Sequence, residues 1–330
     1  MVLKDNHGRK INYVRLAVTD RCNLRCFYCM PENGLHWLER KELMTFEEMM
    51  NICSLLVKMG ITKIRITGGE PFVRKDIMQL LSGLSRLENL EQLTITTNGV
   101  LTAPFVPELK KIGIQSVNLS IDTLDRGRFF SITRRDELPN VLQTLEALLL
   151  HGIETKINAV VMEGKNTEDI ISLAEFTKDM PLSVRFIEEM PFNGSEAHSP
   201  GLHWNYIRII EKLKEKYPGL KKIPDPPYST SCNYQVPGHQ GKIGIIAAYS
   251  RSFCGSCNRI RITPVGELKT CLYDDGVLNI KDEMRKGLSD DELKTILLNA
   301  FGHRPKDGFE AEQKRKEKNP VHESMATIGG

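Results

Sequence analysis

The hydrophobic positions of the chain follow two alternating patterns. Six short runs rich in β-branched residues and bounded by turn residues are typical of strands; they lie at 14–18, 63–67, 92–96, 116–120, 155–161 and 183–187. Between and after these runs, apolar residues recur every three or four positions, which predicts helices at 46–59, 76–87, 105–112, 138–150, 167–180 and 204–217. Thr45 and Glu48 have the spacing of a capping box and so fix the start of the first helix.

Successive strand and helix units predict an α/β fold with a parallel sheet. The chain lacks the G-x-G-x-x-G and Walker motifs, so we favour an incomplete (βα)6 TIM-type barrel over an open doubly wound sheet. A complete barrel has eight units, and we therefore expect the C-terminal region to cover the open side. Prolines between 218 and 227 mark a boundary. They predict a core barrel domain at 1–222 and a C-terminal domain at 223–330.

The composition of the chain mainly argues against certain classes of partner and location. The 330 residues are 40% hydrophobic and 26% charged, as in ordinary globular proteins. A formal net charge of +3 argues against a nucleic-acid partner. The chain has no long apolar run and no signal-peptide core, so we expect no membrane partner and a cytoplasmic location. The eight cysteines should stay reduced there, which favours metal ligands or catalytic thiols over disulfides.

A cysteine-rich loop follows the first predicted strand. Cys22, Cys26 and Cys29, the first cysteine set, have the spacing C-x3-C-x2-C. Soft thiolates select iron–sulfur clusters or zinc, and a short loop can wrap three corners of a cubane cluster. Three protein ligands leave one iron open to a small molecule, which indicates catalysis. The alternatives are a zinc loop with a distant fourth ligand and thiols that are simply buried.

A second set of thiols lies near the C-terminus. Cys254, Cys257 and Cys271, the second cysteine set, follow a strand-like run at 242–249. A zinc ribbon would carry a matching Cys-x-x-Cys pair at its far end, and only one sulfur is present there. Zinc with His239 or Cys232 as the fourth ligand stays open as an alternative.

Further motifs accompany the two cysteine sets. Tyr28 precedes the last thiol of the first set, and Gly68-Gly69-Glu70-Pro71 follows the second predicted strand. With the first set, these residues resemble the radical S-adenosylmethionine (SAM) superfamily. The run Asn258-Arg259-Ile260-Arg261 and the final Gly329-Gly330 are similar to the branch of that superfamily that acts in molybdenum cofactor biosynthesis. The resemblance covers nearly the whole chain.

The resemblance implies cofactors, a reaction and partners. It implies two [4Fe–4S] clusters, one on each cysteine set, with SAM on the open iron of the first. GTP would bind at the second cluster and become (8S)-3',8-cyclo-7,8-dihydroguanosine 5'-triphosphate, after a 5'-deoxyadenosyl radical has removed hydrogen from its ribose C3'. The implied partners are a low-potential electron-donor protein and a downstream pterin synthase; a homodimer is one option that the sequence leaves open.

The resemblance also implies contact residues. For SAM they are Tyr28, Gly69, Ser120 and Met190, and for GTP they are Arg15, Arg65, Thr96, Lys156, Arg259, Ile260 and Arg261. Arg259 and Arg261 are two apart and so share one side of an extended segment. The other cations, and Arg185 in a similar place, lie among apolar strand residues, where charge is costly unless an anion such as triphosphate satisfies it. Glu70 is a candidate acceptor for the amino group of SAM.

Three points stay open. Gly329 and Gly330 are either a frayed end or, by resemblance, a tail that enters the active site. The segment 229–234 departs from the Gly-Pro-Ala-Arg-Tyr-like stretch expected there, so its ligand contacts are in doubt. Two other classes of protein also remain: a radical enzyme with an auxiliary cluster that acts on a peptide or RNA, and a zinc-binding interaction module. The pair Arg259 and Arg261 and the diglycine end speak against the former.

Overall fold

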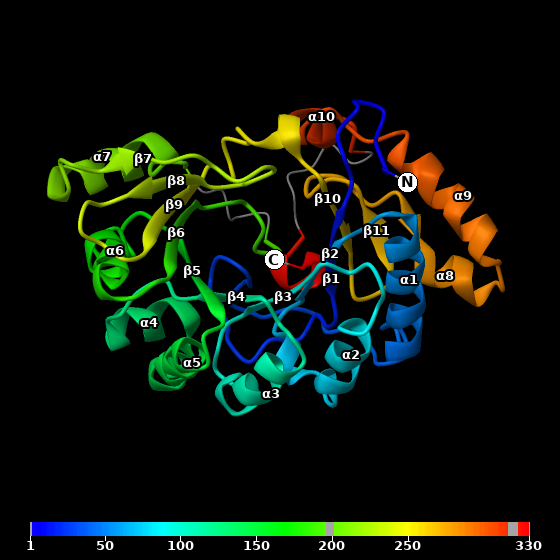
Figure 1. Ribbon diagram of the computed structural model, residues 1–330, viewed down its shortest axis with the longest axis horizontal. Coiled ribbons are helices and arrows are strands. Elements are labelled where there is room, and N and C mark those ends of the chain that lie inside the picture. Colours follow the sequence, from blue (N-terminus) through cyan, green and yellow to red (C-terminus); the bar gives the residue numbers. More distant parts are fainter. Residues whose placement is uncertain (1, 196–200, 316–322, 330) are drawn as a thin grey trace.

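A single open sheet organises the chain (Figure 1). The structure is a computed structural model that describes residues 2–195, 201–315 and 323–329. Its first six strands pair in parallel in chain order; they are β1 (Tyr13–Ala17), β2 (Lys63–Thr67), β3 (Gln92–Thr97), β4 (Ser116–Ser120), β5 (Glu154–Val161) and β6 (Ser183–Glu188). All six predicted strands are thus confirmed to within one residue at either end.

The C-terminal region extends both edges of this sheet. Strand β9 (Lys242–Ile246) pairs in parallel with β6, and β10 (Arg259–Ile262) pairs in parallel with β1. The outermost strands are antiparallel; they are β8 (Cys232–Gln235) and β7 (Lys221–Lys222) beyond β9, and β11 (Glu267–Lys269) and β12 (Leu278–Asn279) beyond β10. The described strands do not close into a ring, which confirms the incomplete barrel. The domain division at residue 222 stays a prediction.

Most of the helices cover the convex face of the sheet, and α8 and α9 lie beside the edge that β10 and β11 form (Figure 1). Those of the barrel are α1 (Phe46–Met59), α2 (Ile77–Leu84), α3 (Val106–Lys111), α4 (Arg126–Thr133), α5 (Leu138–Leu150), α6 (Asp169–Asp179) and α7 (Tyr206–Lys216). The later ones are α8 (Ile280–Arg285), α9 (Asp290–Phe301), α10 (Gly308–Gln313) and α11 (Met325–Ile328), and the 3₁₀ turns are η1 (Pro71–Val73), η2 (Ala103–Phe105) and η3 (Cys254–Ser256). The capping box of α1 is confirmed, because Thr45 and Glu48 each accept the other's backbone N–H. Helix α4 was not predicted, because its arginines interrupt the apolar repeat.

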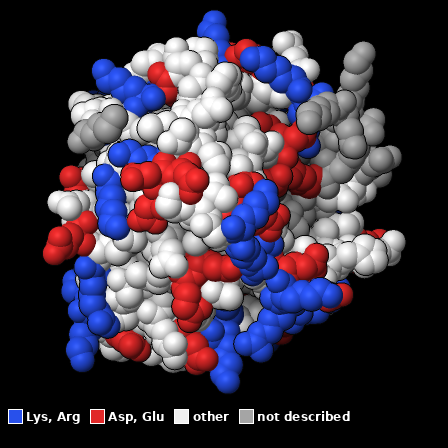
Figure 2. Space-filling view, turned by 90° about the vertical axis from the view of Figure 1, so that its right-hand side faces the viewer, with Lys and Arg blue, Asp and Glu red and all other residues white. Residues whose placement is uncertain are grey.

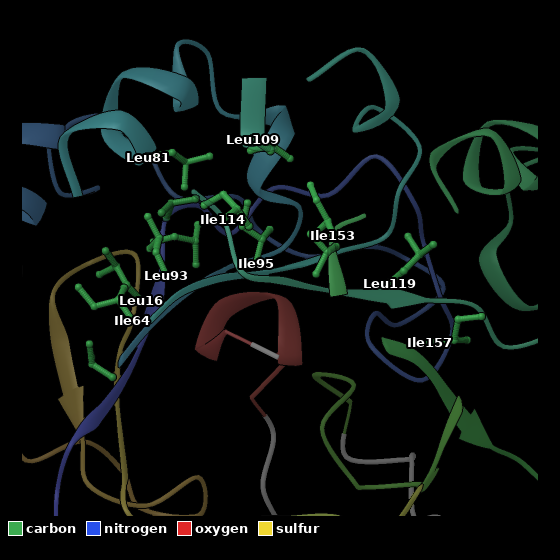
Figure 3. Packing of buried hydrophobic residues seen from close by; sticks show 14 of the residues in the cluster. Leu16, Ile64, Leu81, Leu93, Ile95, Leu109, Ile114, Leu119, Ile153 and Ile157 are labelled. Carbon is green, nitrogen blue, oxygen red and sulfur yellow. The ribbon is translucent and has the colours of Figure 1, made fainter. Parts of the chain in front are cut away.

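The pleat of the strands separates an apolar face from a polar one. Leu16, Ile64 and Ile95 are fully buried on the convex side, toward α2 and α3 (Figure 3). Burial of each such side chain stabilises the fold by about 1.5–3 kcal/mol. The alternate residues of the same strands point to the concave side, where α11 lies (Figure 3). That side carries arginines and threonines, so the fold keeps its polar chemistry inside the barrel.

The surface is mixed in charge. Figure 2 shows Lys and Arg interspersed with Asp and Glu on the side of the molecule where α1, α8 and α9 lie. Within the described part of the chain, no helix has both the length and the apolar character needed to cross a bilayer.

Candidate active site

Helix α4 holds the first cysteine set in place. The set lies on the loop after β1, where Cys29 N donates to Cys26 O at 3.0 Å and closes a turn. Arg25 N donates to Thr133 O at 2.9 Å, and Phe27 N donates to the neighbouring carbonyl of α4. The last carbonyls of a helix have no partner inside the helix, so the loop satisfies them. The unpredicted helix is therefore a support of the cysteine loop.

Two glycines bring β2 against the same loop. A Cβ at Gly68 would lie 2.5 Å from Thr19 O, and a Cβ at Gly69 would overlap Arg21 O. Gly69 N donates to Thr19 O at 2.8 Å. A side chain at either position would push the strand end away from the loop. The two glycines therefore allow the end of β2 to approach the backbone of the loop after β1 closely.

The carboxylate of Glu70 faces inward, which corrects its assignment to the amino group of SAM. Glu70 is fully buried, and its oxygens accept from Thr97 Oγ1 at 2.8 Å, Asn98 N at 2.7 Å and Phe72 N at 3.1 Å. Burial raises its pKa to about 7. Glu70 thus ties β2 to the end of β3. Its neighbour Asn98 contacts the first set instead, because Asn98 Nδ2 lies 3.6 Å from Cys22 Sγ.

The first cysteine set lines a cavity, which we call the first cavity. Tyr28, Gly69, Ser120 and Met190 line it as well, so all four residues predicted for SAM come together there. Asp122, which the sequence did not single out, also lines it. Asp122 Oδ2 accepts from Tyr28 Oη at 2.7 Å, and burial raises its pKa to about 6. The position of Asp122 just after β4, where ligand-binding residues gather, was the sequence signal that could have identified it.

The donor chemistry of the first set fits an iron–sulfur cluster. Burial raises the pKa of the Cys22 thiol to about 11, and it raises those of Cys26 and Cys29 further. Bound iron supplies the positive charge that ionises a buried thiol. Among the described residues, no three His, Cys, Asp or Glu side chains converge as ligands of one metal ion. A cluster has a different requirement, since each thiolate binds its own iron.

The second cysteine set lines another cavity, which we call the second cavity. Cys254 and Cys257 precede β10, and Cys271 follows β11. Burial alone would raise the pKa of Cys257, but the guanidinium groups of Arg259 and Arg304 outweigh it and lower this pKa to about 7. Cys257 thus lies in a positive environment, whereas burial raises the pKa of Cys254 and raises that of Cys271 to about 12.

A row of arginines faces the second cavity. Arg261, Arg15 and Arg65 are register partners on the adjacent strands β10, β1 and β2, and all three line the cavity. Burial, aided by Arg15 and Arg185, lowers the pKa of Arg65 to about 10. The Nε atoms of Arg15 and Arg185 are buried without a hydrogen-bond partner among the described residues. Like charges placed side by side are destabilising, so the row is suited to a bound polyanion.

The residues predicted for GTP divide into two groups. Arg15, Arg65, Thr96, Arg259 and Arg261 line the second cavity. Lys156 does not line it and instead forms an ion pair with Glu154 at 2.9 Å. The side chain of Ile260 is fully buried in the apolar core, because it alternates with those of the two flanking arginines along β10. The side chain of Ile260 therefore faces the core, and a contact between this residue and GTP stays a prediction.

The two cavities adjoin, and the end of the chain reaches them. Their linings share Thr96, Asn158, Ile187, Met190 and Met325. Met325 begins α11, and the carbonyl of Gly329, just after that helix, accepts from Arg261 Nη1. Gly330 lies outside the described residues. In segment 229–234, Thr230 lines the second cavity.

Two known families match successive parts of the chain. Residues 16–177 match the radical SAM superfamily, and residues 182–310 match the family described as Molybdenum Cofactor Synthesis C. The chain is 39% identical to human "Molybdenum cofactor biosynthesis protein 1" over 309 residues, which are 92% of this chain and 48% of that protein. It thus spans about half the length of the animal relatives it matches.

A bacterial relative matches over its whole length. "GTP 3',8-cyclase" of Clostridium perfringens is 37% identical over 330 residues, which are 99% of this chain and 100% of that protein. The chain belongs to the GTP 3',8-cyclase family. As in the wider radical SAM superfamily, a [4Fe–4S] cluster and SAM are the cofactors of this family. The mitochondrial GTP 3',8-cyclase of Arabidopsis thaliana is also 37% identical, over 90% of this chain and 76% of that protein.

Solved structures agree with the fold of this member of the GTP 3',8-cyclase family. Streptococcus suis SuiB superposes with a TM-score of 0.66 at 16% identity, over 96% of this chain and 77% of SuiB. Methylornithine synthase superposes with a TM-score of 0.51 at 18% identity, over 64% of this chain and 63% of that enzyme. At these identities the likeness concerns the fold alone.

Proposed function

We propose that this protein is a radical SAM enzyme that converts GTP to (8S)-3',8-cyclo-7,8-dihydroguanosine 5'-triphosphate for molybdenum cofactor biosynthesis. One observation carries the proposal. Two cavities, each with its own set of three cysteines, adjoin at Met190 and Thr96 inside one barrel. A radical formed on one side can therefore reach a substrate held on the other across this shared lining. Relatives named for this reaction and this pathway support the same conclusion.

The first cavity is suited to SAM. The first cysteine set would hold a [4Fe–4S] cluster with one open iron. When bound and reduced, that cluster supplies the electron that splits SAM into methionine and a 5'-deoxyadenosyl radical. The chain positions the cofactor: the backbone at Gly69 forms one wall, and Asp122 fixes Tyr28 beside the last thiol. Asp122 also places a carboxylate near a ligand that carries a sulfonium cation.

The second cavity is suited to GTP. A second [4Fe–4S] cluster on the second cysteine set would hold the guanine end, and the arginine row would hold the triphosphate. Arginine binds phosphate oxygens through paired N–H groups, and the partnerless Nε atom of Arg15 is such a donor among the described residues. With both ends of GTP fixed, C3' of the ribose and C8 of guanine can be held in a reactive arrangement. Such positioning supplies much of the rate and the selectivity of a reaction.

Lys156 and the tail complete the proposed GTP site at longer range. Burial and the charge of Arg185 lower the pKa of Lys156 to about 8. Lys156 is still mostly protonated at neutral pH, so it adds positive charge near Arg185. Ile260 contributes through its place between Arg259 and Arg261, since its burial orients both. We assign the Gly329-Gly330 tail to the same site, where the contact between Gly329 and Arg261 restrains an arginine of the row.

The proposed reaction requires partner proteins and a reducing compartment. We assign a low-potential protein as electron donor and a pterin synthase as the recipient of the product, with a homodimer as the assembly to test. All eight cysteines are free in the structure, which suits the reducing cytoplasm. A core barrel domain at 1–222 and a C-terminal domain at 223–330 agree with the placement of one cysteine set in each part.

Isotope transfer tests this function directly. The protein, reconstituted anaerobically with iron and sulfide, is incubated with SAM, a chemical reductant and GTP that carries deuterium at C3'. We expect cyclised product and deuterium in the 5'-deoxyadenosine. GTP labelled at C2' is the matched control and should transfer no deuterium. If 5'-deoxyadenosine forms without deuterium while GTP stays intact, the substrate assignment is wrong.

A further inference from the structure

Three buried charged residues lie behind the second cysteine set. Asp5 Oδ2 accepts from Arg9 Nε at 2.7 Å and from Arg304 Nη1 at 3.1 Å. The side chains of Asp5, Arg304 and Arg9 are 0%, 2% and 8% exposed. We call these three residues the Asp5 clasp. A buried ion cluster adds little net stability to the fold by itself. The contacts that Arg304 and Arg9 make with the second cysteine set are therefore the more informative feature.

Arg304 contacts both segments that carry the second set, the loop of Cys257 and the chain next to Cys271. Its Nη1 donates to Cys257 O at 3.3 Å, and its Nη2 lies 3.7 Å from Cys257 Sγ. The same Nη2 donates to the carbonyls of Arg259 and Thr270, each at 3.0 Å. Thr270 is the residue before Cys271. One guanidinium group therefore joins the loop of Cys257 to the chain that carries the third thiol.

Arg9 completes the clasp from the other side. Its Nη1 donates to Cys254 O at 3.2 Å, and its Nη2 donates to Pro305 O at 2.8 Å, next to Arg304. Asp5 also accepts from the backbone N–H groups of His7 and Arg9, each at 2.9 Å. The carboxylate is thus locked in the turn near the N-terminus. All three cysteines of the second set are connected to this turn through Arg9 and Arg304.

We propose that the Asp5 clasp positions the second cluster and sets its reduction potential, an inference that rests on the proposed function for the presence of that cluster. Arg304 is the deciding residue, because its Nη2 donates to a ligand sulfur and brings a positive charge close to it. Hydrogen bonds to ligand sulfurs and nearby positive charge stabilise the reduced cluster and so raise its potential. Asp5 fixes the direction of Arg304, and Arg9 holds the carbonyl of Cys254.

The test isolates the second cluster in the full-length chain. The parent variant carries Cys22→Ala, Cys26→Ala and Cys29→Ala, so only the second set can hold iron after anaerobic reconstitution. Iron per chain and the midpoint potential, followed by electron paramagnetic resonance during a redox titration, are then measured. The parent is compared with the same chain carrying Arg304→Gln, Arg304→Lys or Asp5→Asn. Arg285→Lys, which alters an exposed ion pair with Glu48, is the matched control.

We expect Arg304→Gln to shift the midpoint potential to lower values, because it removes the charge. Arg304→Lys should give a smaller shift in the same direction, since it keeps the positive charge but loses the hydrogen bonds of the guanidinium group to Cys257 and its neighbours. Asp5→Asn should broaden the resonance signal because it releases the guanidinium group, and Arg285→Lys should match the parent. If both Arg304 variants titrate at the parent's potential, the inference is wrong. A parent that binds no iron would instead contradict the second cluster of the proposed function, before any clasp variant is measured.

Discussion

Arg15 and Arg261 are register partners on the adjacent parallel strands β1 and β10, and both face the second cavity. Burial and the charge of Arg15 lower the pKa of Arg261 well below its usual value. The strand that carries Arg261 comes from the C-terminal region and lies against the first strand of the barrel. Two segments far apart in the sequence therefore build one cationic surface.

The Arg261 side chain should matter for the substrate and not for SAM. We expect Arg261→Ala to lower formation of the cyclised product by about 100-fold or more, because it misplaces GTP, while 5'-deoxyadenosine forms at nearly the normal rate. Arg259→Ala should behave in the same way. Chromatography of both products checks this, with Arg126→Ala in an exposed ion pair as the control. An equal loss of both products would count against the division between the two cavities.

The first cysteine set should be needed for SAM cleavage itself. Cys22→Ser removes one thiolate of the first cluster, so we expect 5'-deoxyadenosine formation to be lost. Iron should fall from about eight to about four per chain, since each cluster holds four irons. Cys232→Ser is the control, because Cys232 is exposed and should leave both values unchanged. Normal cleavage by the Cys22 variant would refute the assignment of this cluster.

The sequence predicted most of this arrangement because much of it is locally encoded. The alternation of apolar residues defines β1 to β6, and the spacing of the thiols defines both cysteine sets. The pairing of β9 and β10 with opposite edges of the sheet arises from contacts between distant segments and leaves no local pattern. Their C-terminal position in the sequence gave only the expectation that this region covers the open side.

Side chains whose partners are distant in the sequence leave no local signal either. Asn98, Asp122 and Arg304 are isolated polar residues whose partners lie far away in the sequence. Glu70 stands at a strand end, where ligand-binding residues gather, but the sequence does not show which way a carboxylate turns. In the structure the backbone N–H groups of the β3 end and η1 draw it inward.

Tyr13 should report on the charge of the arginine row. Its hydroxyl is buried without a partner among the described residues, and its ring lies 5.9 Å from Arg15, 5.2 Å from Lys63 and 5.4 Å from Arg65. Burial alone would raise the pKa of Tyr13, but the charges of Arg65, Arg15 and Lys63 outweigh it and lower this pKa to about 7. Tyr13 should therefore ionise near neutral pH.

This shift has a definite effect on stability. The unfolded chain keeps the tyrosine proton up to about pH 10, so between about pH 7 and 10 the unfolded state binds more protons and the contribution of Tyr13 to the free energy of unfolding rises with pH. An ultraviolet difference titration should show a tyrosinate transition near pH 7 that Tyr13→Phe lacks. Added GTP should move it to higher pH, because the triphosphate neutralises the cations. Identical titrations of the two proteins would contradict the prediction.

Gly329 should control cyclisation through its backbone. Its φ is +78°, and a Cβ there would lie 2.8 Å from Ala17 Cβ and 3.1 Å from Thr67 Cγ2. We expect Gly329→Ala to displace the tail from Arg261, and deletion of Gly329 and Gly330 to remove it. Both changes should then greatly reduce the cyclised product, while iron content and 5'-deoxyadenosine formation stay normal.

A matched glycine separates this effect from backbone strain. Gly113 has a φ of +81°, and a Cβ added there would meet nothing within 4 Å, so Gly113→Ala carries the left-handed strain of about 1 kcal/mol without the clash. It should cyclise GTP as the unmodified protein does. Product and 5'-deoxyadenosine are measured in parallel for all three variants. A truncated chain that cyclises GTP at the normal rate would show that the tail has no part in the reaction, and Arg261 would then act on GTP without its restraint.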